Sequence, residues 1–74
     1  MIIKVFSEVL RELRVKNNLS QEKLAELCDL DRTYISLLER GLRQPTLTTL
    51  FKLSVALNVS SSELLRIIEQ RVKQ

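Results

Sequence analysis

Five side chains between residues 32 and 40 have the types and spacing of groups that recognise a polar surface. Four of them recur at i, i+3, i+4 and i+7, which places them on one side of a helix, and an arginine lies beside them in the first turn. The set is Arg32, Thr33, Ser36, Leu37 and Arg40. Arginine can bond bidentately to guanine, hydroxyls donate or accept, and an apolar group can contact a thymine methyl. These groups suit the base edges of DNA, although an ordinary solvated helix face is an equally good reading of this helix alone.

Two short apolar-periodic runs between Gln21 and Arg40 predict two helices joined by a tight turn. The buried faces are Leu24, Ala25 and Cys28 in the first helix, and Tyr34, Ile35 and Leu38 in the second. Only residues 29–31 separate the runs, so the helices must cross closely and share one apolar face. We expect Asp31 to be the N-cap of the second helix, the one that carries the five side chains.

Composition indicates an all-α chain. The 74 residues are 45% hydrophobic and only 4% aromatic, with one Gly and one Pro, which leaves few turns of the kind that strands need. We expect one domain over residues 1–74. No run of about 20 apolar residues and no signal-peptide pattern is present, so we expect no membrane span and a cytoplasmic location.

The sequence offers no catalytic or metal-binding constellation. It has one cysteine and no histidine, so an internal disulfide, a zinc site of the usual spacing and a histidine base are all excluded. No glycine-rich phosphate loop is present, and we expect no enzyme, no cofactor, no metal and no small-molecule ligand. We expect Cys28 to be a small buried hydrophobe. The net charge of +3 is compatible with a polyanionic partner.

Helix-capping residues divide the rest of the chain. We expect a first helix over about 3–16 that buries Phe6, Leu10 and Leu13 and ends at Asn17 and Asn18. Ser20 and Thr46 are predicted N-caps. The helix that begins after Asp31 is expected to end at Gly41. The fourth helix, about 47–57, is predicted to bury Leu47, Leu50, Phe51 and Leu57. Ser60 and Glu63 have capping-box spacing, so a last helix should begin there and run to about Val72.

Three polar residues outside the second helix of the pair are placed to contact phosphate. Gln21 stands at a helix start, where its amide and free backbone N–H groups can donate to a phosphate oxygen. Arg43 and Gln44 lie in the loop after Gly41 and could reach the same backbone. A solvated loop is the ordinary alternative for those two residues.

The last helix is more apolar than one small core requires. Part of its surface is predicted to face a second copy in a two-fold dimer. The residues assigned to that interface are Leu64, Leu65, Ile68 and Val72. The alternative is a terminal helix that buries all of these side chains against its own chain.

Several short motifs fall at the spacing of one known family. They are a Leu-Arg-Glu-Leu-Arg run ending at Arg14, a Leu-Ser-Gln-Glu-x-Leu-Ala run from Leu19 to Ala25, Ile35-Ser36, Glu39 with Gly41, and Pro45-Thr46-Leu47 followed by Thr49-Leu50. With these motifs, residues 10–57 resemble the Xre-type helix-turn-helix family, which includes the phage repressors and Cro proteins. Two departures are Asp29, where the turn usually has glycine, and Leu37, where many members have a polar residue.

The resemblance implies a five-helix bundle of the lambda repressor type, with the third helix in the DNA major groove. It implies that Arg32, Thr33, Ser36 and Leu37 read bases, that Gln21 contacts phosphate, and that Arg40 and Arg43 touch backbone or flanking bases. It also implies an ion pair between Arg14 and Glu39, with a structural role.

Within the family, the run from Leu30 to Ser36 and the short length resemble the controller proteins of restriction–modification systems, which regulate their own operon and the endonuclease gene. Similar runs occur in other short regulators. The expected partners are a pseudo-palindromic double-stranded DNA operator and a second copy of the chain. The rival hypothesis is an antitoxin-like module that grips a partner protein and binds DNA secondarily.

Overall fold

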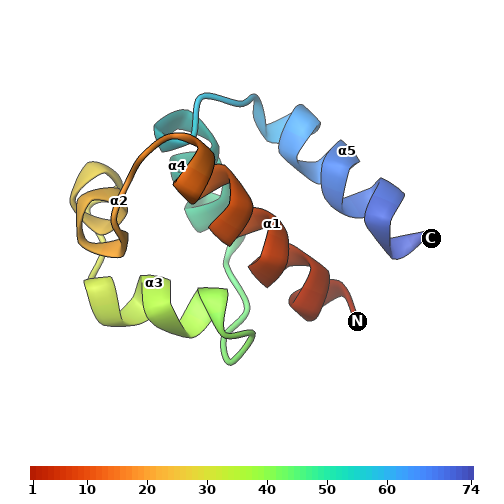
Figure 1. The fold of residues 1–74 in the computed structure, drawn as a ribbon, viewed down its shortest axis with the longest axis horizontal. Coiled ribbons are helices and arrows are strands. Elements are labelled where there is room, and N and C mark those ends of the chain that lie inside the picture. Colours follow the sequence, from red (N-terminus) through yellow and green to blue (C-terminus); the bar gives the residue numbers. More distant parts are fainter.

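The computed structural model describes residues 1–74 and contains five helices and no strands (Figure 1). They are α1 (Ile2–Lys16), α2 (Gln21–Cys28), α3 (Arg32–Glu39), α4 (Leu47–Ala56) and α5 (Ser61–Val72). The predicted all-α class is confirmed, and each predicted boundary lies within a residue or so of the observed one. None of these helices is both long enough and apolar enough to cross a membrane.

Local hydrogen bonds at the caps explain where the helices begin. The hydroxyl oxygens of Ser20, Thr46 and Ser60 each accept a hydrogen bond from the backbone N–H three residues later, at 2.9–3.1 Å. The capping box at Ser60 is only half formed, because the Glu63 carboxylate turns to Arg66 instead of returning to the cap. Asp31 occupies the N-cap position of α3, but its side chain makes no capping hydrogen bond.

Left-handed residues explain where the helices end. Asn18, Asp29 and Asn58 have φ values of 58°, 55° and 61°, and Gly41 has a φ of 72°. Asn and Asp tolerate this conformation better than other residues with a side chain, which is why Asp29 can replace the usual glycine of the α2–α3 turn. The α2–α3 turn therefore stays as short as the sequence predicted.

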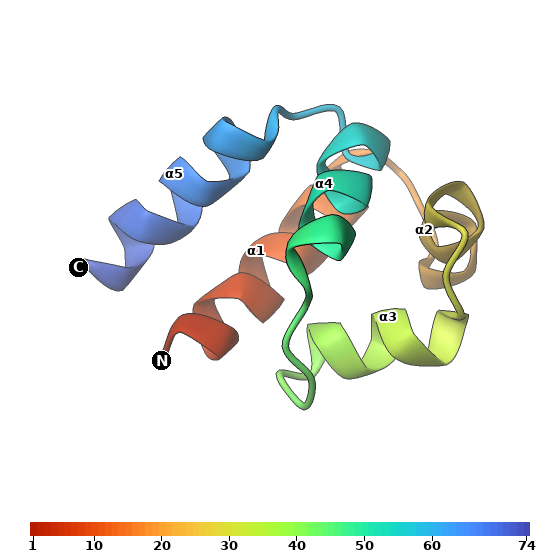
Figure 2. The same ribbon diagram turned by 180° about the vertical axis from the view of Figure 1, so that it is seen from behind.

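Twelve buried side chains from all five helices form one core. The predicted shared face of α2 and α3 is confirmed for Leu24, Ala25, Cys28, Ile35 and Leu38, whereas Tyr34 is only half-buried. In α1, Phe6 and Leu10 are buried as predicted, but Val9 takes the central place and Leu13 is half-buried. α5 packs on α1 at the end where both termini lie (Figure 2). Glu12 and Arg71 join these two helices, and the Arg71 hydrogen bond lowers the pKa of Glu12.

The predicted buried face of α4 is confirmed at Leu57 and in part at Leu50, but it is wrong at Leu47 and Phe51. Phe51 is 54% exposed and Leu47 is more exposed still, whereas Leu53 is completely buried. The core-facing side of α4 is Thr49, Leu53, Ser54 and Leu57, with Leu50 half-buried. α4 itself has apolar residues on every side, so their spacing does not indicate which side of the helix faces the core. Ser54 can face the core because its hydroxyl donates to the Phe51 carbonyl at 2.8 Å.

This revised face of α4 gives a test by matched truncations. We expect Leu53→Ala to lower the free energy of unfolding by about 2–5 kcal/mol, because it empties a fully packed site. Phe51→Ala removes a larger but mostly solvated ring, so its effect should be below about 1 kcal/mol. Urea unfolding followed by circular dichroism measures both. Equal losses, or a larger loss for Phe51→Ala, would contradict the observed orientation of α4.

Candidate nucleic-acid interface

α3 lies along one edge of the molecule, and no other helix covers its outer side (Figures 1 and 2). Ile35 and Leu38 point into the core and fix which side faces outward. On the outward side Arg32, Thr33 and Arg40 are exposed, and Ser36 and Leu37 are half-buried. The structure thus brings the four predicted base-reading side chains together with Arg40 on one outward face, with an arginine at each end.

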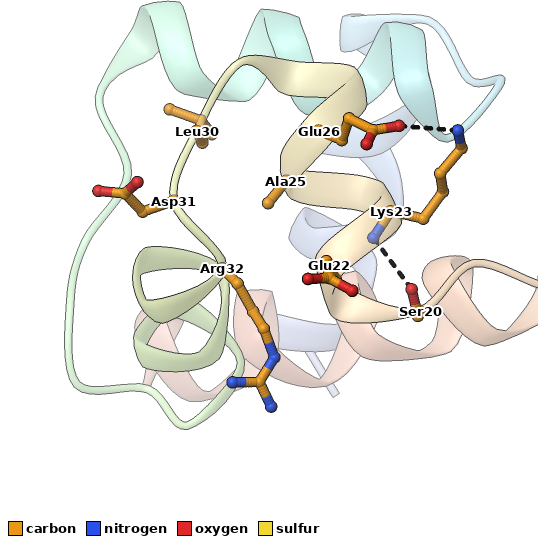
Figure 3. Close-up of a pocket in the computed structure, with 8 residues that line it drawn as sticks. All are labelled: Ser20, Glu22, Lys23, Ala25, Glu26, Leu30, Asp31 and Arg32. Carbon is orange, nitrogen blue, oxygen red and sulfur yellow. Dashed lines mark hydrogen bonds and ion pairs between the residues drawn. The ribbon is translucent and has the colours of Figure 1, made fainter.

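The starts of α2 and α3 meet around a shallow hollow (Figure 3). Figure 3 shows Arg32 extending from the first turn of α3 toward the side where α2 begins. Glu22, Glu26 and Asp31 also line the hollow, and Lys23 pairs with Glu26 at 2.8 Å. This pairing raises the pKa of Lys23 and lowers the pKa of Glu26. Arg32 makes no ion pair within the chain, so its guanidinium is free for an external acceptor.

A buried ion pair holds the C-terminal end of α3 against α1. Arg14 Nε donates to Glu39 Oε2 at 2.6 Å, and Arg14 Nη2 donates to Glu39 Oε1 at 3.1 Å. The side chains of Arg14 and Glu39 are only 13% and 4% exposed. Arg14 also donates to the carbonyl of Leu19 at 2.8 Å, and Gln21 Nε2 donates to Glu39 Oε1 at 3.1 Å. The ion pair that the resemblance implied is thus present. Gln21, the first residue of α2, is hydrogen-bonded to it.

The loop after α3 carries Arg43 and Gln44. Arg43 lies near Thr33 and Leu37 of α3, whereas Gln44 lines a different hollow with residues of α1 and α5. The N–H of Leu42 bonds to the Leu37 carbonyl, which closes the end of α3. The Arg43 guanidinium lies 5.7 Å from the centre of the Tyr34 ring, a cation–π distance. Gln44 is exposed and makes no hydrogen bond within the chain. Tyr34 packs against the core from a half-buried position, as its place in the apolar period indicated, but sequence reasoning missed its contact with Arg43.

Cys28 plays no part in this face. Its thiol is buried and lies 3.6 Å from the carbonyl oxygen of Lys52. Burial raises its pKa, so the thiol stays protonated and unreactive at neutral pH. The expectation of a small buried hydrophobe is confirmed.

A helix-turn-helix family model matches residues 10–64, which is most of the described chain. The chain belongs to the helix-turn-helix family. The match contains the α2–α3 pair, both residues of the buried ion pair and the beginning of α5. The helix-turn-helix unit itself is Gln21–Glu39, with residues 29–31 as its turn.

Several control and controller proteins are similar to the chain. Control protein C.BamHI of Bacillus amyloliquefaciens is 50% identical over 62 residues, which is 82% of this chain and 76% of that protein. The restriction-modification controller protein C.AhdI from Aeromonas hydrophila is 45% identical, with a TM-score of 0.80 over 84% of this chain and 94% of that one. A C.Esp1396I controller tetramer, in complex with its natural 35 base-pair operator, is 30% identical, with a TM-score of 0.89 over 100% of this chain and 97% of that one.

The four residues assigned to a dimer interface are not equally accessible. Leu64 and Ile68 are buried in the chain's own core, because the turn of α5 that carries them faces α1 and α4. Leu64 therefore has no surface to offer a second copy. Leu65 is 47% exposed and Val72 is half-buried. Together with Ile2 and Ile68 they form the apolar part of a groove beside α5, whose other lining residues are Ser62, Arg66, Glu69 and Lys73.

We expect the buried Arg14–Glu39 ion pair to contribute far more to the free energy of unfolding than the exposed ion pairs do. Arg14→Ala or Glu39→Ala should each lower the free energy of unfolding by about 3–5 kcal/mol, because each leaves the partner's charge buried and unpaired. The double variant Arg14→Met/Glu39→Leu should recover most of that loss, since it removes both charges and keeps the site filled. Urea unfolding gives these values.

Lys23→Ala is the control for this cycle. The Lys23–Glu26 ion pair is exposed, so its loss should leave the unfolding free energy unchanged within error. A double variant as unstable as the sum of its single variants would show that Arg14 and Glu39 do not act as a pair.

Proposed function

We propose that this chain is a sequence-specific transcriptional regulator that binds a pseudo-palindromic DNA operator as a homodimer. The outward face of α3 supports this proposal: two exposed arginines, the exposed Thr33 and the half-buried Ser36 lie there, and the core and the Arg14–Glu39 pair hold the helix from its inner side. Each copy would insert α3 into one major groove, with half-sites one helical turn, or about 34 Å, apart.

The side chains divide into two roles. Arg32, Thr33 and Ser36 would bond to base edges, and Leu37 would contact a thymine methyl. The phosphate contacts would come from Gln21, Arg40, Arg43 and Gln44, which set the register of the protein on the duplex. Arg14 and Glu39 would not contact the DNA themselves. This division has no catalytic step, so the proposed role is binding without enzymatic activity.

The relatives support a narrower assignment, to the controllers of restriction–modification systems. C.AhdI and C.Esp1396I are named as such controllers, and the second is bound to an operator. By analogy, this chain would regulate its own operon and an endonuclease gene from within the cytoplasm. If the chain binds its operator as a dimer, its own concentration would control occupancy, through the equilibrium between monomer and dimer.

The apolar groove beside α5 supports the second copy. Its lining includes Leu65 and Val72, which the chain's own core leaves partly uncovered. A two-fold axis through this groove would bring the same residues of both copies together, as an isologous interface requires. The dimer would then hold the two α3 helices at a fixed separation.

The decisive experiment is selection of bound sequences from a random duplex pool, with wild type and Arg32→Ala side by side. Salt of about 150 mM weakens non-specific phosphate binding. We expect a two-fold symmetric consensus for wild type, and relaxed preference at one position per half-site for the variant, because each lost base contact is worth about 1–3 kcal/mol of discrimination. No enrichment with either protein would overturn the proposal and favour a protein partner instead.

The dimer surface has its own test by sedimentation equilibrium. Leu65→Lys places a charge in the groove beside α5, so this variant should be monomeric at concentrations where wild type is dimeric. Val55→Lys is the matched control, since Val55 is an exposed apolar residue on α4 outside the groove. It should dimerise as wild type does. Monomers from Val55→Lys with an intact Leu65→Lys dimer would move the interface to α4.

A further inference from the structure

The position and the hydrogen bond of Gln21 suggest both a structural role and a phosphate contact. It is the first residue of α2, at the exposed start of the helix-turn-helix unit. Its side-chain nitrogen nevertheless turns inward and donates to Glu39 Oε1 at 3.1 Å. One half-buried amide thus touches the buried ion pair that fixes α3.

The chemistry of a carboxamide allows it to serve two acceptors at once. The nitrogen carries two N–H groups that point in different directions, and the structure uses only one of them. The backbone N–H groups of the first helical residues have no acceptor within their helix, and the positive end of the helix dipole lies there. The second side-chain N–H therefore stands where a phosphate oxygen is favoured.

The charges around Glu39 make this arrangement compatible with a nearby phosphate. A lone carboxylate would repel that anion, but Arg14 binds both oxygens of Glu39 and neutralises it. Gln21 is itself neutral, so the cluster as a whole presents a hydrogen-bond donor and no net negative charge. A glutamate at position 21 would lack the donor and add a repelling charge.

We propose that Glu39 is a positioning residue for DNA binding, which aims the amide of Gln21 so that one N–H stays on Glu39 while the other donates to phosphate. This inference rests on the proposed function, because it assumes a bound duplex. The Glu39 carboxylate then fixes both the orientation of α3 and the orientation of the Gln21 side chain, which contacts the DNA phosphate. Because the hydrogen bond to Glu39 already holds the Gln21 side chain, less side-chain entropy is lost on binding.

The test replaces single phosphates of the selected duplex by neutral methylphosphonates and measures each dissociation constant by fluorescence anisotropy. For wild type we expect a loss of about tenfold at the phosphate that Gln21 contacts, the size of one hydrogen bond to a charged group. Gln21→Ala should be insensitive at that phosphate. Glu39→Gln, which keeps the shape but cannot accept all three hydrogen bonds, should be insensitive there as well.

Gln44 is the matched control, because its exposed amide has no hydrogen bond within the chain. Gln44→Ala identifies its phosphate, and Glu39→Gln should keep full sensitivity at that position, which a general loss of folding would not do. If Glu39→Gln does not fold, Arg14→Met/Glu39→Leu takes its place. Full sensitivity of either Glu39 variant at the Gln21 phosphate would overturn the inference.

A second measurement needs no variant of Glu39. In NMR spectra of wild type, the two side-chain amide protons of Gln21 should be separately resolved, and only one of them should shift when the duplex is added. Shifts of both protons, with loss of the bond to Glu39, would overturn the shared-amide arrangement. Wild type that selects no sequence would overturn the proposed function itself, whereas specific binding that ignores Gln21 would overturn only this inference.

Discussion

The carboxylate of Glu39 is the constraint on which the rest of this structure depends. Burying an ion costs several kcal/mol unless it is paired and fully hydrogen-bonded, so Arg14 and Gln21 must come to it. Those partners belong to α1 and to the first turn of α2, and Arg14 also holds the loop between them through the carbonyl of Leu19. Three helices thus meet at one charge, and their mutual positions follow from its geometry.

Because of this constraint, the inner side of α3 stabilises the fold, and its outer side is left for contacts with a partner. α3 has eight residues, too few for a helix that is stable alone in water. Ile35, Leu38 and Glu39 hold it from the inner side, so its outer side can carry side chains that contribute little to folding. Arg32 and Thr33 are exposed, so changes at these positions should not disturb the core.

Sequence reasoning succeeded where the signal is local. Capping residues and left-handed Asn and Asp placed all five helices, and apolar spacing identified the shared face of α2 and α3. It failed on α4, where apolar residues on every side hide the period and the largest side chains were wrongly assigned to the core. It also missed contacts between distant residues. Gln21 meets Glu39, and Arg43 meets Tyr34, only because the fold brings them together.

If the outer face of α3 enters the major groove, methyl groups there should block binding. Methylation interference on the selected duplex measures this, because one reagent methylates guanine N7 in the major groove and adenine N3 in the minor groove. We expect N7 methyl groups to block binding at two sites about one helical turn apart, and N3 methyl groups to have no effect. Interference at adenine N3 alone, or no interference in either groove, would contradict this placement of α3.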